Sequence, residues 1–312
     1  MVDYVAVVLA KKEATYGVDA VPVVGTNGIL TRNYSGKPVD IDQIERNLDT
    51  RVFGALAGAP SNERRSISYE VEVAGSGTAG TAPGWMELLE GCGMAAPVLT
   101  ATTSAKQQFA LPGVAASSLS QYDHLSNQRR KMIGSVGTYS LDFTAGAYPF
   151  IGFQWMGLVP TATPFDTSAP GAVDLTRWRQ PVEVNIDNTE FLLDGYAPAL
   201  RSWKAEAGVA TAMRNLVGKR YVRRGNHAFK STAVIEAPDI ATKNYIQALR
   251  VGALVEWEMT HGIVAGNIIE MASTKVQITE IAESKEDDIL MWTLSMTHTV
   301  EGGVSDFGIT AK

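Results

Sequence analysis

The sequence has a single cysteine, Cys92, in 312 residues, which excludes an intrachain disulfide and any metal site built from several cysteines. It also has no apolar run of the roughly 20 residues that a membrane-spanning helix needs. The N-terminal apolar run is too short for a secretory signal and carries Asp3 where positive charge is expected. These absences favour a protein that is made and folded in a cytoplasm and has no membrane partner.

Motifs for catalysis and metal binding are also missing. The histidines are far apart in the sequence and share no metal-ligand spacing; they are His124, His227, His261 and His298. There is no P-loop, no GxSxG elbow and no HExxH. The acidic run 283–288 lacks the spacing of a calcium loop, so we expect a solvated hairpin tip. We therefore expect no catalytic, cofactor-binding or metal-binding residues, and we expect His298 to lie on a strand surface.

One segment, residues 66–93, has the outline of a dinucleotide-binding fingerprint. An alternating strand is followed by Gly-Ser-Gly-Thr-Ala-Gly at 75–80 and by a short helix that begins near Pro83. However, Pro83 removes a backbone donor at the helix start, and residues 95–103 contain no carboxylate to bind a ribose. The later strands read as hairpins rather than as strands joined by crossover helices. We interpret the glycines as a mobile or tightly turning connection.

Glycine is abundant, with 29 residues, while charged residues make up only 19% of the chain. This composition, with repeated alternation of apolar and polar residues, predicts a mainly β protein with short helices. The predicted fold is an antiparallel β-sandwich or barrel domain, duplicated, with each copy flanked by a helix. The net charge of −6 gives no support to nucleic-acid binding through bulk electrostatics.

The two halves of the sequence present the same features in the same order. Each has an Arg-Asn-Leu triplet, at 46–48 and 214–216, followed by a basic segment, an alternating strand, a proline at a helix start and a hairpin with a tryptophan strand. This order predicts an internal duplication, and the alternative is two unrelated β-rich regions. The predicted division is an N-terminal arm at 1–38, a first domain at 39–160, a linker at 161–182 and a second domain at 183–312.

Several segments resemble the tail tube, or major tail, proteins of tailed bacteriophages. One is Lys-Glu-Ala-Thr-Tyr-Gly-Val-Asp at 12–19, and another is the glycine loop with its helix at 74–93. The third is Ile-Glu-Ala-Pro at 235–238, followed by Thr-His-Gly at 260–262 and Gly-Asn at 266–267. Each match is modest alone, but the matches extend over nearly the whole chain in a consistent order.

This resemblance implies a structural virion protein rather than an enzyme, located in the tail and assembled in the host cytoplasm. Subunits of this family form rings whose strands join into an inner barrel, and the rings stack into the conduit for DNA ejection. The implied partners are copies of the chain itself, the tape measure, terminator and baseplate or tip proteins, and passing double-stranded DNA without specific binding. A trimer with two tube domains per chain would give a pseudo-sixfold ring, and a hexamer with one tube domain per chain is the alternative.

Two sets of residues follow from this interpretation. A lumen that passes DNA should be polar and not cationic, because cations that neutralise phosphates bind DNA. The candidate lumen-facing residues on alternating strands are Glu70, Glu72, Asp142, Glu236, Thr293 and Ser295. Long loops at 39–65 and 201–228 are expected to contact the next ring, with Arg46, Arg51, Arg64, Arg65, Arg214 and Arg220 as the candidate residues.

Other interpretations remain open from the sequence. The polar strand faces could be merely solvent-exposed, and the basic segments could be solvated surface. A different class of function is a carbohydrate- or receptor-binding β-sandwich at a phage tail or a cell surface. A third is an enzyme that uses the Gly-Ser-Gly-Thr-Ala-Gly loop to hold a phosphate-bearing ligand.

Overall fold

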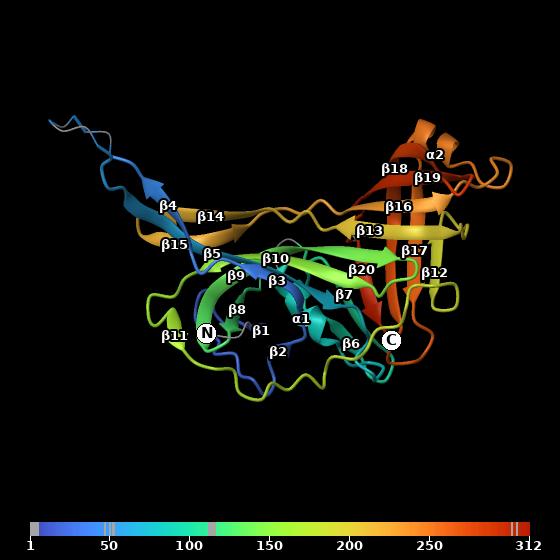
Figure 1. Cartoon of the computed structure of the whole chain (residues 1–312). Helices are drawn as coiled ribbons and strands as arrows, with labels where there is room; N and C mark the ends of the chain where they lie inside the picture. The colour runs from blue at the N-terminus through green and yellow to red at the C-terminus, as the bar shows by residue number, and fades with distance from the viewer. Residues whose placement is uncertain are drawn as a thin grey trace.

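The computed structural model describes residues 6–46, 48–49, 51, 54–111, 117–300, 302–303 and 305–312. This part of the chain forms twenty strands and two short helices, which confirms the predicted mainly β class (Figure 1). All of its pairings between named strands are antiparallel, as the hairpin pattern of the sequence predicts. A parallel βαβ unit for a dinucleotide is therefore absent from the described residues.

The elements of the first half are β1 (Ala6–Lys12), β2 (Gly28–Ile29), β3 (Arg32–Gly36), β4 (Asp40–Ile44), β5 (Ala59–Glu72), α1 (Gly84–Gly91), β6 (Val98–Thr100), β7 (Ser104–Gln108), β8 (Leu119–Leu125), β9 (Gln128–Thr144), β10 (Phe150–Leu158) and β11 (Phe165–Thr167). Those of the second half are β12 (Thr189–Leu193), β13 (Leu200–Glu206), β14 (Thr211–Leu216), β15 (Lys219–Arg224), β16 (Lys230–Glu236), α2 (Tyr245–Val251), β17 (Leu254–His261), β18 (Ile269–Glu286), β19 (Ile289–His298) and β20 (Gly308–Ala311).

The first half is a two-layered sandwich in which one long strand serves both layers. The C-terminal part of β9 pairs with β10, which pairs with β5 and then β3. The N-terminal part of β9 pairs with β8 and β11, and β8 pairs with β1. Helix α1 contributes Trp85, Met86, Leu88 and Leu89 to the core and packs against β1 and β9.

The second half repeats much of this order and pairing, although β2, β6 and β7 have no counterpart there. There β18 is the long strand, which pairs with β19 through its C-terminal part and with β17 and β20 through its N-terminal part. The chain of partners β16–β19–β18–β17–β12 matches β5–β10–β9–β8–β1. Strand β13 pairs with β16 as β3 pairs with β5. A long hairpin follows β13 and β3 in each case, formed by β14 and β15 or by β4 and the N-terminal part of β5.

The two halves are joined edge to edge, because β13 pairs with β9. The strands β3, β5, β10, β9, β13, β16, β19 and β18 therefore form one continuous layer, which we call the shared sheet. A second connection is the β6–β7 hairpin of the first half, which crosses over so that β7 pairs with β20. The two halves are therefore joined by hydrogen-bonded strands at two places.

Two predictions about the segments outside the domains are wrong. Residues 1–38 do not form an arm in their described part, because β1 pairs with β8 along its whole length and Val8 is fully buried. The linker at 161–182 contains β11, and its irregular remainder lies along the first half, where the Trp178 indole donates to the carbonyl of Gly28 at 2.8 Å. Both segments are part of the fold rather than appendages.

The Gly-Ser-Gly-Thr-Ala-Gly loop is a packed contact between the halves, not a mobile connection. The amide of Gly75 donates to Asn267 Oδ1 at 2.6 Å, and the amide of Gly77 donates to the carbonyl of Gly266 at 2.9 Å. These donors would otherwise be the natural ligands of a phosphate. A Cβ at Gly75 would lie 2.0 Å from the Gly266 oxygen, so only glycine fits there.

Gly75→Ala is therefore expected to lower the free energy of unfolding by about 2 kcal/mol or more, because two backbone segments must separate. Chemical denaturation of the purified protein measures this loss. The matched control is Gly171→Ala, where a Cβ would meet only Val24 Cγ2 at 3.7 Å. Equal stability of the two variants would contradict the packed contact.

Three histidines are buried, His124, His261 and His298, which corrects the expectation that His298 is a surface residue. The His298 ring is within hydrogen-bond distance of Ser231, with Nε2 at 2.8 Å from Oγ, and it stands edge-on to Phe229. Burial lowers the pKa of His298 to about 4, and it does the same for His261. Both rings are therefore neutral at pH 7.

The folded pKa of His298 lies below its unfolded value of 6.5, so the unfolded chain binds more protons between these values. We expect His298 to destabilise the fold progressively as the pH falls from about 6.5 to about 4, by up to roughly 3 kcal/mol. Urea unfolding at pH 7, 6 and 5 measures the effect, with the non-titrating variant His298→Gln for comparison. The stability of the variant should fall less steeply, and parallel curves would contradict the prediction.

Candidate functional site

The outward face of the shared sheet carries all six residues predicted to face a lumen. Alternation sends Tyr69, Tyr139 and Phe153 into the core and leaves polar side chains on the other side. Cross-strand register then aligns one polar row, which runs Glu72, Phe150, Asp142, Lys204, Thr232, Ser295 and Glu280. Glu70, Glu236 and Thr293 are at neighbouring positions of the same face. The structure thus brings the six together, while their exposure to a lumen stays a prediction.

The cations on this face lie beside carboxylates. Arg32 Nε is 2.6 Å from Glu70 Oε2, Lys204 Nζ is 2.8 Å from Asp142 Oδ2, and Arg201 Nε is 3.2 Å from Glu286 Oε1. Lys230 is directly opposite Glu206 in the β13–β16 register. Sequence reasoning missed these basic residues, because the partners belong to strands that are distant along the chain. The face is therefore polar with its positive charges locally balanced.

Glu72 and Glu236 differ from Glu70 and Asp142 in this respect. The ion pairs of the described residues include Glu70 and Asp142 but neither Glu72 nor Glu236. Glu70 also accepts from Asn33 Nδ2 at 3.0 Å, where β3 bulges against β5. Glu70 therefore braces the sheet edge, while the charges of Glu72 and Glu236 are not balanced by an ion pair among the described residues.

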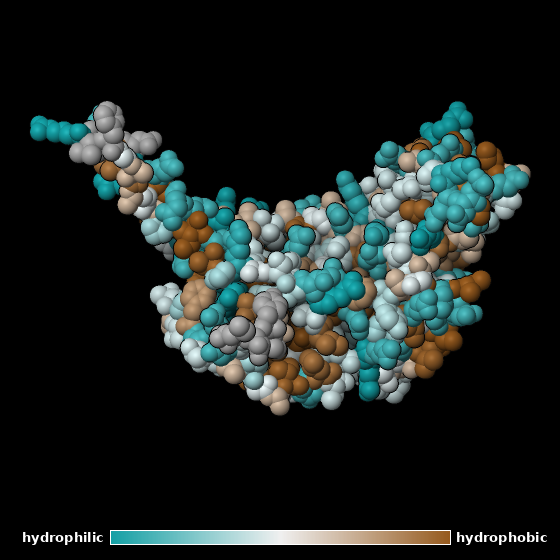
Figure 2. Space-filling view, in the orientation of Figure 1, coloured by the Kyte–Doolittle hydropathy of each residue, from teal (hydrophilic) through white to brown (hydrophobic). Residues whose placement is uncertain are grey.

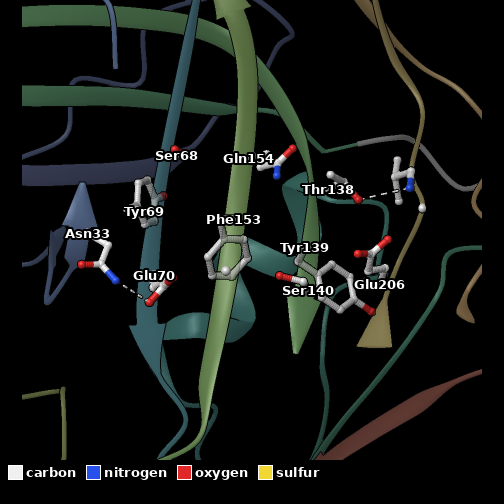
Figure 3. Close-up of a pocket in the computed structure, with 13 residues that line it drawn as sticks. Asn33, Ser68, Tyr69, Glu70, Thr138, Tyr139, Ser140, Phe153, Gln154 and Glu206 are labelled. Atoms are coloured by element: carbon white, nitrogen blue, oxygen red, sulfur yellow. Dashed lines mark hydrogen bonds between the residues drawn. The ribbon is translucent and has the colours of Figure 1, made fainter. Parts of the chain in front are cut away.

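A depression of about 350 Å³ lies on this face of the first half (Figure 3). Its polar lining includes Ser68, Ser140 and Gln154, and Glu70 and Glu206 lie on opposite sides of it. The aromatic rings beneath it are buried and offer no exposed platform on which a sugar ring could stack. The depression thus has the polarity of the rest of the face, without the aromatic surface that a carbohydrate site needs.

Figure 2 shows the surroundings of this face. The molecule has a crescent outline, hollowed on the side along which β13, β14, β15 and β16 run in Figure 1. One end of the crescent is the projecting β4–β5 hairpin, and the other carries α2 with the tips of β18 and β19. Along the hollowed side most residues are coloured teal or white, which means that they are hydrophilic or of intermediate hydropathy.

The loops predicted to contact a neighbouring ring form two hairpins that lie against each other. Asn215 Nδ2 on β14 donates to Asn62 Oδ1 on β5 at 2.9 Å. Arg220 on β15 approaches Glu63, with Nη1 at 4.0 Å from Oε2. Arg64 braces the first hairpin through Asp42, with Nη1 at 3.1 Å from Oδ2. The contact between the two hairpins was not foreseen, since nothing in either segment indicates the other as a partner.

The remaining predicted arginines are exposed, and apolar side chains accompany them. Arg46 and Arg51 lie between β4 and β5, and Arg214 lies on β14. The exposed apolar residues near these hairpin ends are Ile41, Ile44, Leu48, Leu56, Leu216 and Val217, of which Val217 is fully exposed. Sequence reasoning overlooked them, although isolated aliphatic residues within a polar stretch were a visible signal.

Arg65 is a correction, because its side chain is entirely buried and cannot contact a neighbouring ring. Its Nη1 lies 2.6 Å from Asp123 Oδ1, and Asp123 is 1% exposed. Arg65 is two residues before Ile67, so alternation already placed it on the core face. The basic dipeptide therefore divides between the two sides of the sheet, with Arg64 outside and Arg65 inside.

The described part of the chain lacks two other kinds of feature, a cluster of metal ligands and a membrane-spanning helix. Groups of three or more histidine, cysteine, aspartate or glutamate side chains that could hold a metal ion do not occur there. The helices of this part are too short to cross a bilayer.

Comparison with known proteins leaves the function to be argued from this geometry. No protein-family model and no curated protein matches the chain. The features that bear on function are the resemblance in the sequence, the repeated pairing of the strands and the outward face of the shared sheet.

Proposed function

We propose that this protein is a tail tube subunit of a tailed bacteriophage, a structural protein without a catalytic site or cofactor. The observation that carries the proposal is the repeated topology, in which two halves with the same strand partners are joined edge to edge in one sheet. A repeated edge-to-edge contact is a head-to-tail arrangement, and such an arrangement closes into a ring when its rotation fits. The chain is then two consecutive segments of that ring.

The strand count favours a ring of three chains over a ring of six. Each half supplies four strands to the shared sheet, β3, β5, β10 and β9 in the first and β13, β16, β19 and β18 in the second. Both halves therefore act as tube domains, and neither has the character of a peripheral domain. Three chains would present six such domains around the axis. Closure of the sheet would remove its exposed edges, which are otherwise sites of uncontrolled pairing.

The outward face of the shared sheet suits a bore that passes DNA. Phosphate-binding cations make DNA adhere through release of counterions. On this face Arg32 and Lys204 are held beside Glu70 and Asp142, so their charges are already balanced. The face would repel or ignore the DNA backbone rather than bind it. DNA is then a passenger without specific contacts.

The paired hairpins suit contact between stacked rings. Their exposed apolar residues, Ile44 and Leu48 among them, would be covered by a neighbouring copy, and Arg46, Arg51 and Arg214 are free to meet acidic groups there. The ends of such a stack would meet the tape measure, terminator and baseplate or tip proteins. The protein would function in the virion tail after assembly in the host cytoplasm.

Negative-stain microscopy combined with light scattering tests the proposal. We expect rings or tubes with a central channel, and a mass of three chains for the smallest closed ring. A protein that stays monomeric at high concentration and binds an oligosaccharide array would instead support the carbohydrate-binding alternative. A six-chain ring would keep the tube and reject the trimer.

The charge of the bore gives a second prediction. The double variant Glu72→Lys with Glu236→Lys should assemble as the wild type does, because neither carboxylate is in an ion pair of the described residues. The new cations should retain DNA, which lowers infectivity in a complementation assay by an order of magnitude or more. The matched control, Glu72→Gln with Glu236→Gln, removes charge without adding cations and should have a smaller effect. Normal infectivity of the lysine variant would contradict the assignment of this face to the bore.

A further inference from the structure

The junction between the two halves gives a template for a contact between chains. At this junction β13 pairs antiparallel with the C-terminal part of β9. Leu141 is opposite Ala205 and Phe143 is opposite Trp203, and all four side chains are buried. The alternate position, Asp142 opposite Lys204, is on the outward face. Strand pairing, an apolar inner row and a polar outer row together define the junction.

Strand β18 of the second half corresponds to β9, and the edge of β18 that corresponds to the edge of β9 paired with β13 is free. In the first half, β8 covers one edge of β9 as far as Ser135, and β13 occupies that edge farther on. In the second half, β17 covers the same edge of β18 as far as Gln277. From 278 to 286, β18 pairs with β19 on its other side, and no described strand lies on this edge.

The strand that corresponds to β13 is free in the same way. β13 has two partners, β16 and β9. Its counterpart β3 pairs with β5, which corresponds to β16, and has no second strand partner within the described residues. The shared sheet therefore ends in two free edges, on β18 and on β3, which correspond to the two strands, β9 and β13, that pair at the internal junction.

Cross-strand rows fix how these edges would align. On β9, the first residue of β8 is opposite Ser135, and Leu141 comes six residues later. On β18, the first residue of β17 is opposite Gln277, and Glu283 comes six residues later. Leu141 and Glu283 are therefore equivalent. On the other side, Ala205 is opposite Ser231, and Gly36 is opposite Ile67. The rows through Val71 and Ile235 make Ser231 and Ile67 equivalent, so Gly36 corresponds to Ala205.

We propose that β3 of one copy of this chain adds antiparallel to the free edge of β18 of another copy, with Gly36 opposite Glu283 and Ser35 opposite Ser284. The contact rests on the proposed function in one respect, that repetition of it closes a ring. The shared sheet then continues from chain to chain through the same geometry that joins the two halves of one chain.

The chemistry of this junction differs from that of the internal one. At the inward positions where the internal junction has Leu141 and Phe143 of β9, β18 has Glu283 and Lys285. Charged residues at inward positions protect a free edge from premature pairing. The edge of β18 also carries Glu280 and Glu286, so two β18 edges repel each other.

The opposing edge has the complementary charge. The charge comes from Lys37, which follows β3 with an exposed side chain and lies 3.6 Å from Asp40 through Nζ and Oδ1, whereas Arg32 on β3 is already held by Glu70. Attraction between this edge and the acidic edge of β18 selects the head-to-tail pair over a pair of like edges. The junction between chains is therefore expected to weaken with salt more than the apolar junction within a chain.

A disulfide across the junction tests the proposal. Ser35 and Ser284 are exposed, and they lie on strands at opposite ends of the shared sheet, so cysteines there cannot bond within one chain. Paired residues of antiparallel strands are within the Cα separation that a disulfide accepts. The native Cys92 is buried and does not interfere. The variant Ser35→Cys with Ser284→Cys should form covalent multimers under mild oxidation, in a ladder that stops at three chains.

The matched control is Ser68→Cys with Ser284→Cys, because Ser68 is on the same face but one strand inside the edge, opposite Ser35. It should give less than a tenth of the cross-linked product. Circular dichroism of both variants should match that of the wild type, which checks that they fold. Equal cross-linking in the control, or none in the test variant, would overturn the junction.

The outcome is separable from that of the tube proposal. Tubes without the cross-link would keep the tube function and overturn this junction. A cross-link in open fibres without a channel would keep the junction and overturn the tube. A second measurement is Lys37→Glu, which should weaken assembly at low salt at least several-fold, with Glu283→Lys restoring it. Additive losses in the double variant would count against the proposed charge pairing.

Discussion

The structure depends on the hydrogen-bonding demand of strand edges. A strand leaves one row of donors and acceptors unpaired wherever its neighbour ends, and those groups need a partner. In this chain β9 and β18 extend beyond the ends of their neighbours β8 and β17, because each long strand continues from one layer of the sandwich into the other. The edge thus opened on β9 is filled by β13, which joins the two halves into one sheet.

This constraint orders the other features of the molecule. The inner side of the shared sheet is filled by aromatic residues, with Trp203 stacked on Trp257 at 4.7 Å, while most side chains on the outer side are polar. The glycine loop at 75–80 and the loop at 262–267 meet where the halves adjoin, and their backbones approach too closely for any side chain at Gly75. A rigid relation between the halves is what a ring of fixed curvature would need.

Local patterns in the sequence predicted a good part of this fold. The alternating strand that begins segment 66–93 and the hairpin tip within 283–288 were both foreseen, because alternation and turn residues act over a few positions. The burial of Arg65 against Asp123 was not, since a buried guanidinium requires a carboxylate that is distant along the chain. The β6–β7 hairpin, which leaves its own half to pair with β20, likewise has no local signal.

The sequence by itself determined which residues share a face, because a strand alternates with a period of two whatever its neighbours are. It therefore placed Glu70, Glu72 and Asp142 on one side and their apolar neighbours on the other. Only the tertiary structure decided which edges meet, since pairing between β9 and β13 or between β7 and β20 is a non-local choice among similar strands. That choice put the polar faces of both halves on one side of a single sheet and left β3 and β18 as its ends.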